Sequence, residues 1–313
     1  MKESKKKAKH HITIEDIPYT SIEFAKNNPV SLESGTSHKM QLVTGPANAT
    51  DHRIKWTSSN KTAATVDENG TVTALRPIET VTITAVYKTN PALTCSWNLK
   101  ITRTKGYITK QMLDNLDLTA IKKVMITAHP DDETLWGGGH LIEGEYLVVC
   151  MTHGWNPKRR TAFEQTMRTT NDKYLILDYP DVRKTFSNGK YETDMLSTCK
   201  NAMQEDINLI LSYKKWDLIA THNPFGEYGK FLHKTISQMV TQCYNKMTNK
   251  SATLYYFGRY YNSSNKIPGE QIAPELLAIK NSMVDRYYPT AKGAIVAFGH
   301  MIPYENWLLP SEW

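Results

Sequence analysis

A histidine, a proline and three consecutive acids follow an apolar run in the stretch VMITAHPDDETLWGGGH, residues 124–140. His129 and Asp132 lie three positions apart, across a proline whose fixed φ stiffens the turn. A neutral imidazole and a carboxylate are both suitable ligands for a first-row divalent metal ion. The pattern therefore indicates a metal site at the end of a buried strand.

A metal ion held in this way needs a third protein ligand, and His233, at the start of a helix after a later strand, is the best candidate. Three protein ligands leave positions open for water and substrate, as a catalytic zinc ion requires. Asp131 is then free to accept a proton from water whose pKa the metal lowers to about 7. Glu133 can support the loop or its helix. We predict one Zn²⁺ ion on His129, Asp132 and His233.

Two other interpretations of HPDDE stay open at this point. An aspartate before a helix is a favoured N-cap and acids suit the first helical turn, so the stretch can be a plain turn. The same ligand types also match the iron site built from two histidines and one carboxylate. Iron oxygenases of that kind usually present these ligands on a β-barrel, which the surrounding sequence pattern does not favour.

The sequence after residue 119 alternates between strand-like and helix-like segments. This alternation predicts an α/β domain, residues 120–313, with a Rossmann-like parallel sheet and helices on both faces. Ligands bind such sheets beyond the carboxyl ends of the strands, where HPDDE, THGW, DYPD and HNPFGEYGKFLH stand. The glycines at 137–139 do not form a GxGxxG dinucleotide fingerprint. The expected strands are 124–128, 146–151, 174–177, 218–221 and 253–257.

Residues 12–104 show a different rhythm, with short β-type runs separated by turn residues. This spacing predicts an all-β sandwich with a hairpin turn at ENG, residues 68–70. Trp56 is expected to fill its core. Residues 105–119 are expected to form a linker, and the basic residues 1–11 a disordered tail.

The composition is that of a soluble globular chain, since 40% of the 313 residues are hydrophobic and 22% are charged. No apolar run approaches the roughly 20 residues of a membrane span, and the first residues lack the apolar region of a signal peptide. The four cysteines show no CxxC spacing and are expected to be buried thiols. The net charge of +7 favours anionic cell-wall polymers, whereas the scattering of basic residues over both halves argues against nucleic-acid binding.

The segments IKWTSSNKTAATVDENGTVTAL and VTITA closely resemble the bacterial Ig-like domain of group 2 (BIG2). The resemblance covers most of residues 12–104. Such domains are typical of bacterial surface and secreted proteins, where they act as spacers or adhesive modules. The resemblance therefore implies an extracellular or cell-surface location, although the sequence shows no export signal and a cytoplasmic location stays open.

Residues from about 120 to 300 resemble the PIG-L/LmbE family of zinc-dependent N-acetylglucosaminyl deacetylases. The resemblance rests on AHPDDE after a strand, LVVCMTHG, RRTAFEQ on the following helix, and YGxxxH after the fourth strand. It implies zinc on His129, Asp132 and His233, with Asp131 as the general base. Tyr228 matches a tyrosine thought to contact the substrate carbonyl or the tetrahedral intermediate, and a phenol beside a metal can stabilise such an oxyanion.

One position departs from the family pattern. Members commonly have YGHxxH, whereas this chain has YGKFLH, so Lys230 replaces the first histidine. A lysine stabilises negative charge but is a poorer proton shuttle unless it is desolvated. The proton donor for the leaving amine stays open between Lys230, Asp131 and His300, which lies in a stretch where the family often carries a histidine. The alternative for His300 is a packed or surface histidine.

Five further polar residues are candidate substrate contacts because they stand near strand ends or match the family: His153, Arg160, Glu164, Asp178 and His222. Arg160 and Glu164 lie four apart on one helix, which also suits an ordinary surface ion pair. Asp178 and its neighbour Asp181 can bind sugar hydroxyls or cap a turn.

The predicted function is hydrolysis of the acetamide of an N-acetylglucosamine-type sugar, giving a free amine and acetate. A cell-wall or extracellular glycan is the expected substrate. The alternative is a catalytically impaired surface protein that binds carbohydrate or mediates adhesion, an interpretation motivated by Lys230.

Overall fold

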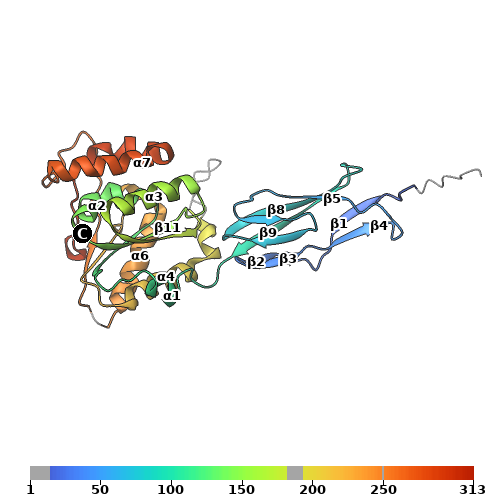
Figure 1. The fold of residues 1–313 in the computed structure, drawn as a ribbon, viewed down its shortest axis with the longest axis horizontal. Coiled ribbons are helices and arrows are strands. Elements are labelled where there is room, and N and C mark those ends of the chain that lie inside the picture. Colours follow the sequence, from blue (N-terminus) through green and yellow to red (C-terminus); the bar gives the residue numbers. More distant parts are fainter. Residues whose placement is uncertain (1–14, 182–192, 249) are drawn as a thin grey trace, which may run out of the picture.

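The computed structural model describes residues 15–181, 193–248 and 250–313. Figure 1 shows a β domain formed by the N-terminal part of the chain and an α/β domain formed by the rest. The tail expected at residues 1–11 lies outside the described residues. No helix in the described ranges has both the length and the apolar character needed to cross a membrane.

The N-terminal domain consists of β-strands that share one core. A four-stranded sheet of order β2-β9-β8-β5 and a three-stranded sheet of order β3-β7-β6 contribute buried residues to the same cluster, and β1 pairs with β4. In β8 the buried Val81, Ile83 and Ala85 alternate with more exposed residues, as the period of a half-buried strand requires. The strands are β1 Ser21–Phe24, β2 Ser31–Glu33, β3 Ser37–Lys39, β4 Leu42–Gly45, β5 Ile54–Ser58, β6 Ala64–Val66, β7 Thr71–Ala74, β8 Ile78–Tyr87 and β9 Thr94–Thr102.

The hairpin expected at ENG connects β6 to β7, which pair antiparallel. Asp67 Oδ1 accepts hydrogen bonds from the N–H groups of Asn69 and Thr71, at 2.9 and 2.7 Å. Gly70 has a φ of +80°, a conformation that favours glycine, and the Trp56 ring packs directly on it. Trp56 is half-buried against the core rather than enclosed by it.

The C-terminal domain is built on a five-stranded parallel sheet of order β12-β11-β10-β13-β14. The chain starts in the middle at β10, moves outward through β11 and β12, and then returns to the other side of β10. The carboxyl ends of β10 and β13 are therefore neighbours at the point where the strand order reverses, which is where such sheets bind ligands. The strands are β10 Lys123–Thr127, β11 Tyr146–Thr152, β12 Lys173–Tyr179, β13 Leu218–Thr221 and β14 Thr253–Tyr256.

Helices cover both faces of this sheet (Figure 1). Helices α2, α3 and α7 contact one another on one face, and α4 contacts α6 and α1 on the other. The strand residues alternate accordingly, because Met125 and Val148 join the core on the α2 face whereas Val124 and Ile126 join the core on the α4 face. The helices are α1 Lys110–Asp114, α2 Asp132–Glu143, α3 Pro157–Thr170, α4 Lys200–Tyr213, α5 Gly226–Gly229, α6 Phe231–Lys246 and α7 Pro274–Phe298, with short 3-10 turns η1 Thr193–Thr198, η2 Gly299–Met301 and η3 Pro310–Glu312.

The segment 105–119, expected as a linker, is instead part of the α/β domain. It contains α1, and Ile108, Leu113 and Leu118 are buried in the core cluster on the α4 face. These apolar side chains pack under the sheet, so the connection between the domains is shorter than the sequence pattern suggested. Among the cysteines, Cys150, Cys199 and Cys243 are buried thiols as expected, and Cys95 is half-buried.

Candidate metal centre and active site

The three predicted metal ligands meet at the carboxyl ends of β10 and β13. His129 Nδ1 lies 3.2 Å from Asp132 Oδ2 and 3.0 Å from His233 Nε2. His233 Nε2 lies 3.4 Å from Asp132 Oδ2, and all three side chains are buried. Asp132 is the first residue of α2 and His233 lies in the first turn of α6, so two helix starts and one strand end hold the group.

These separations match what a zinc ion needs. Ligand atoms about 2.0–2.1 Å from a tetrahedral zinc ion lie about 3.3 Å from one another. The observed separations of 3.0, 3.2 and 3.4 Å bracket that value. The donor set of two imidazole nitrogens and one carboxylate oxygen therefore fits a divalent zinc ion with open positions for water and substrate.

Two carboxylates orient the two histidine rings. His233 Nδ1–H donates to Glu227 Oε2 at 2.5 Å, and His129 Nε2–H donates to Asp181 Oδ1 at 3.0 Å. Each ring thereby turns its other nitrogen toward the shared point near Asp132. A hydrogen bond from the far ring nitrogen to a carboxylate is the usual way in which proteins fix the tautomer of a metal-binding histidine.

His222 lies behind the three ligands, with both ring nitrogens bonded within the protein. Its ring is fully buried, Nδ1–H donates to Glu227 Oε2 at 3.1 Å, and Nε2 accepts the N–H of Ala128 at 2.9 Å. Both ring nitrogens therefore have partners inside the protein, and His222 is not among the residues that line the cleft beside the ligands. The ring instead ties the end of β10 to the loop after β13.

Burial and charge set the protonation of the central residues. Burial lowers the pKa of His233 to about 4, so its ring is neutral and able to bind a metal ion. Burial and the adjacent Asp132 raise the pKa of Asp131 to about 7. For Asp132 itself, burial favours the neutral acid, but the imidazole groups around it hold its pKa well below the usual range.

Asp131 stands beside the ligands in a strained conformation. Its φ is +138°, its N–H donates to Glu133 Oε2 at 3.0 Å, and its carboxylate lies 3.9 Å from Arg159. Positive φ also occurs at His153 and Glu227, which border the same centre. Non-glycine residues held in such conformations concentrate at functional sites, because the surrounding structure must stabilise them.

A cleft of about 120 Å³ opens next to the three ligands. It is smaller than the roughly 300 Å³ of the smallest typical small-molecule pockets, so it has room for a group of a few heavy atoms. Two carboxylates other than Asp132, two cations and several aromatic rings surround it. The lining residues are His129, Asp131, Asp132, Trp136, Arg159, Asp181, Tyr228, Lys230, Ala294 and Phe298.

Tyr228 and Lys230 both line this cleft, as their predicted roles require. The Tyr228 ring is 42% exposed and stands edge-on to His233, with 5.6 Å between ring centroids. Burial of the phenol, followed by the charges of Asp132 and Asp131, raises the pKa of Tyr228, so it remains an O–H donor. Lys230 Nζ lies 3.9 Å from Asp181 Oδ2.

Arg160, Glu164 and Asp178 are not among the residues that line the cleft. Arg160 and Glu164 form a surface ion pair at 3.7 Å, and Arg160 Nε donates to the carbonyl of Gly154. Arg159 on α3 faces the cleft in place of Arg160, and Asp181, beyond the end of β12, faces it in place of Asp178. One residue along a helix rotates a side chain by about 100°, which is enough to exchange Arg160 for Arg159.

His153 and His300 lie near the site but not on the cleft wall. The His153 ring stands behind His129, with 5.7 Å between their centroids. His300 donates Nε2–H to the carbonyl of Tyr261 at 2.8 Å and lies edge-on to Tyr260. In this structure His300 is packed against Tyr260 and Tyr261, which agrees with the alternative that the sequence left beside proton donation.

Glu227 is the functional residue that sequence reasoning did not single out, and Asp181 is one that it left unassigned. A search for a carboxylate partner of each metal-binding histidine would have pointed to both. Glu227 immediately precedes Tyr228 in the motif, and Asp181 lies in the same DYPD segment as Asp178. Nothing in residue type distinguishes Asp181 from Asp178.

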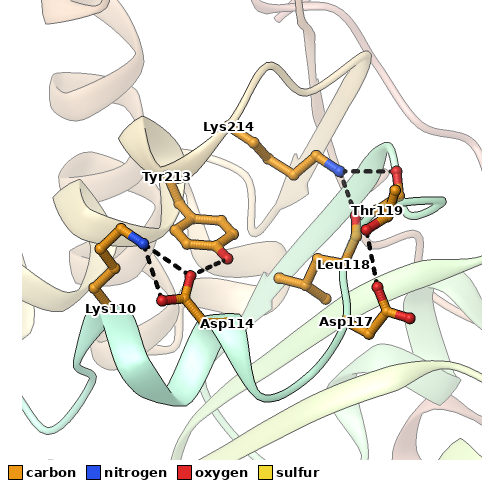
Figure 2. A pocket seen from close by; sticks show the side chains of 7 residues that line it. All are labelled: Lys110, Asp114, Asp117, Leu118, Thr119, Tyr213 and Lys214. Atoms are coloured by element: carbon orange, nitrogen blue, oxygen red, sulfur yellow. Dashed lines mark hydrogen bonds and ion pairs between the residues drawn. The ribbon is translucent and has the colours of Figure 1, made fainter.

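A second hollow, of about 380 Å³, is lined by residues that precede β10 and β13, at the amino ends of these strands (Figure 2). Its charged groups are already paired with one another or with the backbone. Lys110 and Tyr213 both bind Asp114, and Lys214 donates to the carbonyls of Leu118 and Thr119. This arrangement closes a turn of the chain and presents no reactive group to a ligand.

Comparison with known proteins identifies the N-terminal domain. Residues 18–96 match the family model of the bacterial Ig-like domain (group 2). The first domain of the chain is therefore a bacterial Ig-like domain, and such domains occur in surface or extracellular bacterial proteins.

Two curated relatives and one solved structure resemble longer parts of the chain. The uncharacterized protein L374 of Acanthamoeba polyphaga mimivirus is 31% identical over 175 residues, which cover 50% of this chain and 67% of that protein. The uncharacterized protein CA_P0160 of Clostridium acetobutylicum is 32% identical over 117 residues, 37% of this chain but only 12% of that protein. The crystal structure of the conserved protein TT1542 from Thermus thermophilus is 13% identical, with a TM-score of 0.42, and covers 62% of this chain and 96% of its own.

The identity and coverage of the mimivirus match define a family. The chain belongs to the same family as protein L374.

Proposed function

We propose that the chain is a zinc-dependent hydrolase that removes the N-acetyl group from an N-acetylglucosamine-type sugar. The observation that carries this proposal is the meeting of His129, Asp132 and His233, with ligand atoms 3.0–3.4 Å apart, beside the cleft that holds Asp131. The resemblance of HPDDE and YGxxxH to the PIG-L/LmbE deacetylases supports the same assignment. The Ig-like domain supports a cell-wall or extracellular glycan as the substrate.

In this proposal, some residues of the centre hold a metal ion and another moves a proton. His129 Nδ1, Asp132 Oδ2 and His233 Nε2 would hold zinc, while Glu227 and Asp181 keep the two rings oriented. When bound, the ion supplies Lewis acidity and makes hydroxide available at neutral pH. Asp131, beside the ligands and next to Arg159, accepts the proton of the attacking water at its carboxylate.

In the proposed reaction, Tyr228 and Lys230 act in the later steps. The phenol O–H of Tyr228 donates to the oxyanion that forms when the acetamide carbonyl is attacked. Asp131 returns its proton to the leaving nitrogen, and Lys230, on the Asp181 side of the cleft, stabilises negative charge there. His300, whose Nε2–H is bonded to Tyr261, has no part in this scheme.

The size of the cleft supports an acetamide as the group that enters it. A volume of about 120 Å³ holds an acetamido group but not a sugar ring. The ring and any further sugar units must then lie outside the cleft, against the surface around Tyr228, which is 42% exposed. This arrangement suits a reaction at one substituent of a longer glycan.

Zinc content and acetate release together test the proposal. The His233→Ala variant should lose bound zinc, whereas Asp131→Asn should keep most of it and release acetate about 10²–10⁴-fold more slowly from acetylated chitooligosaccharides or wall glycans. Glu164→Gln, which changes the surface pair on α3, should alter neither quantity. Equal zinc content in wild type and His233→Ala would contradict the ligand assignment.

A catalytically impaired carbohydrate-binding protein is the second candidate, and the position of Lys230 in the cleft favours it. Under this alternative, zinc-loaded wild type binds acetylated glycans but releases no acetate from any of them. A Lys230→His variant that gains activity over an inactive wild type would support impairment at this position. Acetate release by the wild type excludes the alternative.

A further inference from the structure

The Ig-like domain contacts the α/β domain beside the candidate metal centre. Arg76, just after β7, is 8% exposed, and one of its guanidinium nitrogens donates to Thr62 Oγ1 at 2.8 Å within its own domain. Its Cζ lies 4.5 Å from the centroid of the Trp155 ring, which belongs to the loop between β11 and α3. A buried guanidinium over an indole face is the favourable geometry of a cation–π contact.

The contact continues from Trp155 to the candidate metal ligands. The rings of Trp155 and His153 are stacked, with 6.2 Å between centroids and an interplanar angle of 24°. His153 in turn lies 5.7 Å from the ring of His129. A line of side chains therefore runs from the Ig-like domain to one metal ligand.

His153 needs support from its surroundings to keep this position. Its φ of +65° is in the left-handed region, which few non-glycine residues adopt. Thr152 Oγ1 lies 2.7 Å from His153 Nδ1 and also donates to the carbonyl of Ala128, the residue before His129. The loop after β11 is thus held between the turn that carries His129 and the Ig-like domain.

A second contact limits rotation of one domain on the other. The N–H of Arg103 donates to the carbonyl of Thr198 at 2.8 Å, and Lys100 Nζ lies 3.4 Å from Ser197 Oγ. Figure 1 shows the ends of β8 and β9 beside η1, where these bonds form. Two separate contacts, one at Trp155 and one at η1, define an orientation that a single linker would leave free.

The charges at the interface come from both domains. Burial raises the pKa of Asp178 at the end of β12, and nearby guanidinium groups oppose that shift, namely those of Arg160, Arg76 and Arg103. Two of these three arginines precede the α/β domain in the chain. Asp178, which does not line the cleft, therefore has a place at the domain interface.

We propose that Arg76 is a positioning residue for the active site. The Ig-like domain, through Arg76, holds Trp155 and His153 against the back of His129, so the two domains work as one unit instead of an enzyme with a detached spacer. The functional part of this inference rests on the proposed metal centre, whereas the mechanical part, that Arg76 orders the loop after β11, does not.

Hydrogen exchange of the full-length protein, followed by mass spectrometry, tests the mechanical part. Arg76→Ala should speed exchange in the peptide covering residues 150–158 by about tenfold, while peptides from β8 and β9 keep their protection and show that the Ig-like domain is folded. Trp155→Leu, which removes the contact from the other side, should have the same effect. Lys55→Ala, an exposed change in the same domain, is the control. Unchanged exchange at 150–158 in Arg76→Ala would overturn the inference.

Binding of Co²⁺ to the same variants tests the functional part. Arg76→Ala should shift the visible absorption spectrum of the Co²⁺-loaded protein and raise the Kd for Co²⁺ by about threefold to tenfold. This is less than the roughly 10–100-fold effect of removing a direct partner of a metal ligand, because Arg76 acts through Trp155 and His153. Arg76→Lys, which keeps the charge, should have a Kd for Co²⁺ between those of Arg76→Ala and wild type. A spectrum and Kd equal to wild type in Arg76→Ala overturn the positioning role. If wild type binds neither Co²⁺ nor Zn²⁺, the proposed function is contradicted and the positioning role falls with it. The exchange experiment then still decides whether Arg76 orders the loop after β11.

Discussion

Glu227 places two imidazole rings with one oxygen atom. Its Oε2 accepts hydrogen bonds from His222 at 3.1 Å and from His233 at 2.5 Å, and all three side chains are buried. The backbone of Glu227 is itself strained, with a φ of +53° in the left-handed region. A single acidic residue therefore fixes both the proposed ligand His233 and the ring that supports the end of β10.

Replacing Glu227 by glutamine should weaken metal binding without removing a ligand. An amide has only one accepting oxygen, so either the two imidazole N–H groups on Oε2 or the Asn223 N–H on Oε1 would face an NH₂ group. The two rings would also lose the negative charge that orients them. We expect zinc affinity to fall by about 10–100-fold, measured by competition with a chromogenic chelator. Glu164→Gln, on the surface of α3, should leave the affinity unchanged. Unaltered affinity in Glu227→Gln would show that His233 does not depend on this carboxylate.

Asp172, just after the C-terminal end of α3, gives a pH dependence that is independent of the metal centre. Its Oδ1 accepts the N–H of Tyr146 at 2.7 Å, and burial raises the pKa of Asp172 from 3.8 to about 7. A carboxyl group whose pKa is raised by folding contributes stability below its unfolded pKa, and that contribution is lost as the pH rises through its folded pKa. Ionisation of wild-type Asp172 therefore lowers stability between about pH 4 and 7.

Asp172→Asn should become more stable relative to wild type as the pH increases over this range. The asparagine oxygen can still accept the Tyr146 N–H but never becomes charged. The difference in the free energy of unfolding should rise by at most about 1.4 kcal/mol per pH unit and level off above about pH 7. Urea unfolding at pH 5, 6, 7 and 8 measures it, with the exposed Asp285→Asn as control. A difference that does not vary with pH would refute the raised pKa of Asp172.

At the scale of elements, α2 is interrupted at the glycines 137–139, and the ion pair of Lys280 and Glu305 packs against the interruption. Gly137 has non-helical angles, so the N–H groups of Gly139 and His140 are free to donate to Glu305, at 2.6 and 3.0 Å. Lys280 of α7 binds the same carboxylate at 2.6 Å, and both charged side chains are buried. A Cβ atom on Gly138 would collide with Lys280. Since Asp132 begins α2, this anchor also helps to fix a proposed metal ligand.

Removing one member of this pair should be costly. Lys280→Ala leaves the Glu305 carboxylate buried without its cation, and we expect a loss of about 3–5 kcal/mol in the free energy of unfolding. The double variant Lys280→Met with Glu305→Gln should recover much of that loss, because no unpaired charge remains. Lys292→Ala, an exposed change on the same helix, should stay within about 0.5 kcal/mol. Denaturant unfolding compares the four proteins, and equal stability of Lys280→Ala and wild type would contradict the role of the pair.

The helices and strands were largely predictable from the sequence, whereas the directions in which individual side chains point were not. Hydrophobic periodicity placed the five strands of the α/β domain close to their observed bounds, and 218–221 coincides with β13. Because the strand order puts the ends of β10 and β13 side by side, residues 129, 132 and 233 meet. The choice of Arg159 over Arg160 depends on the rotation of α3, which no local pattern determines. The partners Glu227 and Asp181 depend on loop conformations that only the folded structure defines.

At the scale of the whole molecule, the chain passes from one domain to the other through residues 103–108 and is anchored there by α4. Asp206 accepts hydrogen bonds from the N–H groups of Tyr107 and Ile108, at 2.9 and 2.8 Å, and from the hydroxyl of Tyr179 at 2.6 Å. Its side chain is 1% exposed. One buried carboxylate thus fixes both the entry of the chain into the α/β domain and the end of β12, next to the domain interface.

Asp206→Ala should therefore destabilise the α/β domain and loosen the junction together. The buried N–H of Ile108, the part-buried N–H of Tyr107 and the buried hydroxyl of Tyr179 would lose their acceptor. At about 1–3 kcal/mol for each unsatisfied buried group, we expect a loss of at least about 2 kcal/mol. Calorimetry should show a lower unfolding temperature for the α/β domain, and small-angle X-ray scattering a larger radius of gyration. Glu205→Ala removes an exposed acceptor for the adjacent Gly106 N–H and should change little, because water can replace it. If Asp206→Ala lowers stability while the radius of gyration stays at the wild-type value, the contacts at Trp155 and η1 hold the domains together without this anchor, and the junction is not what sets their arrangement.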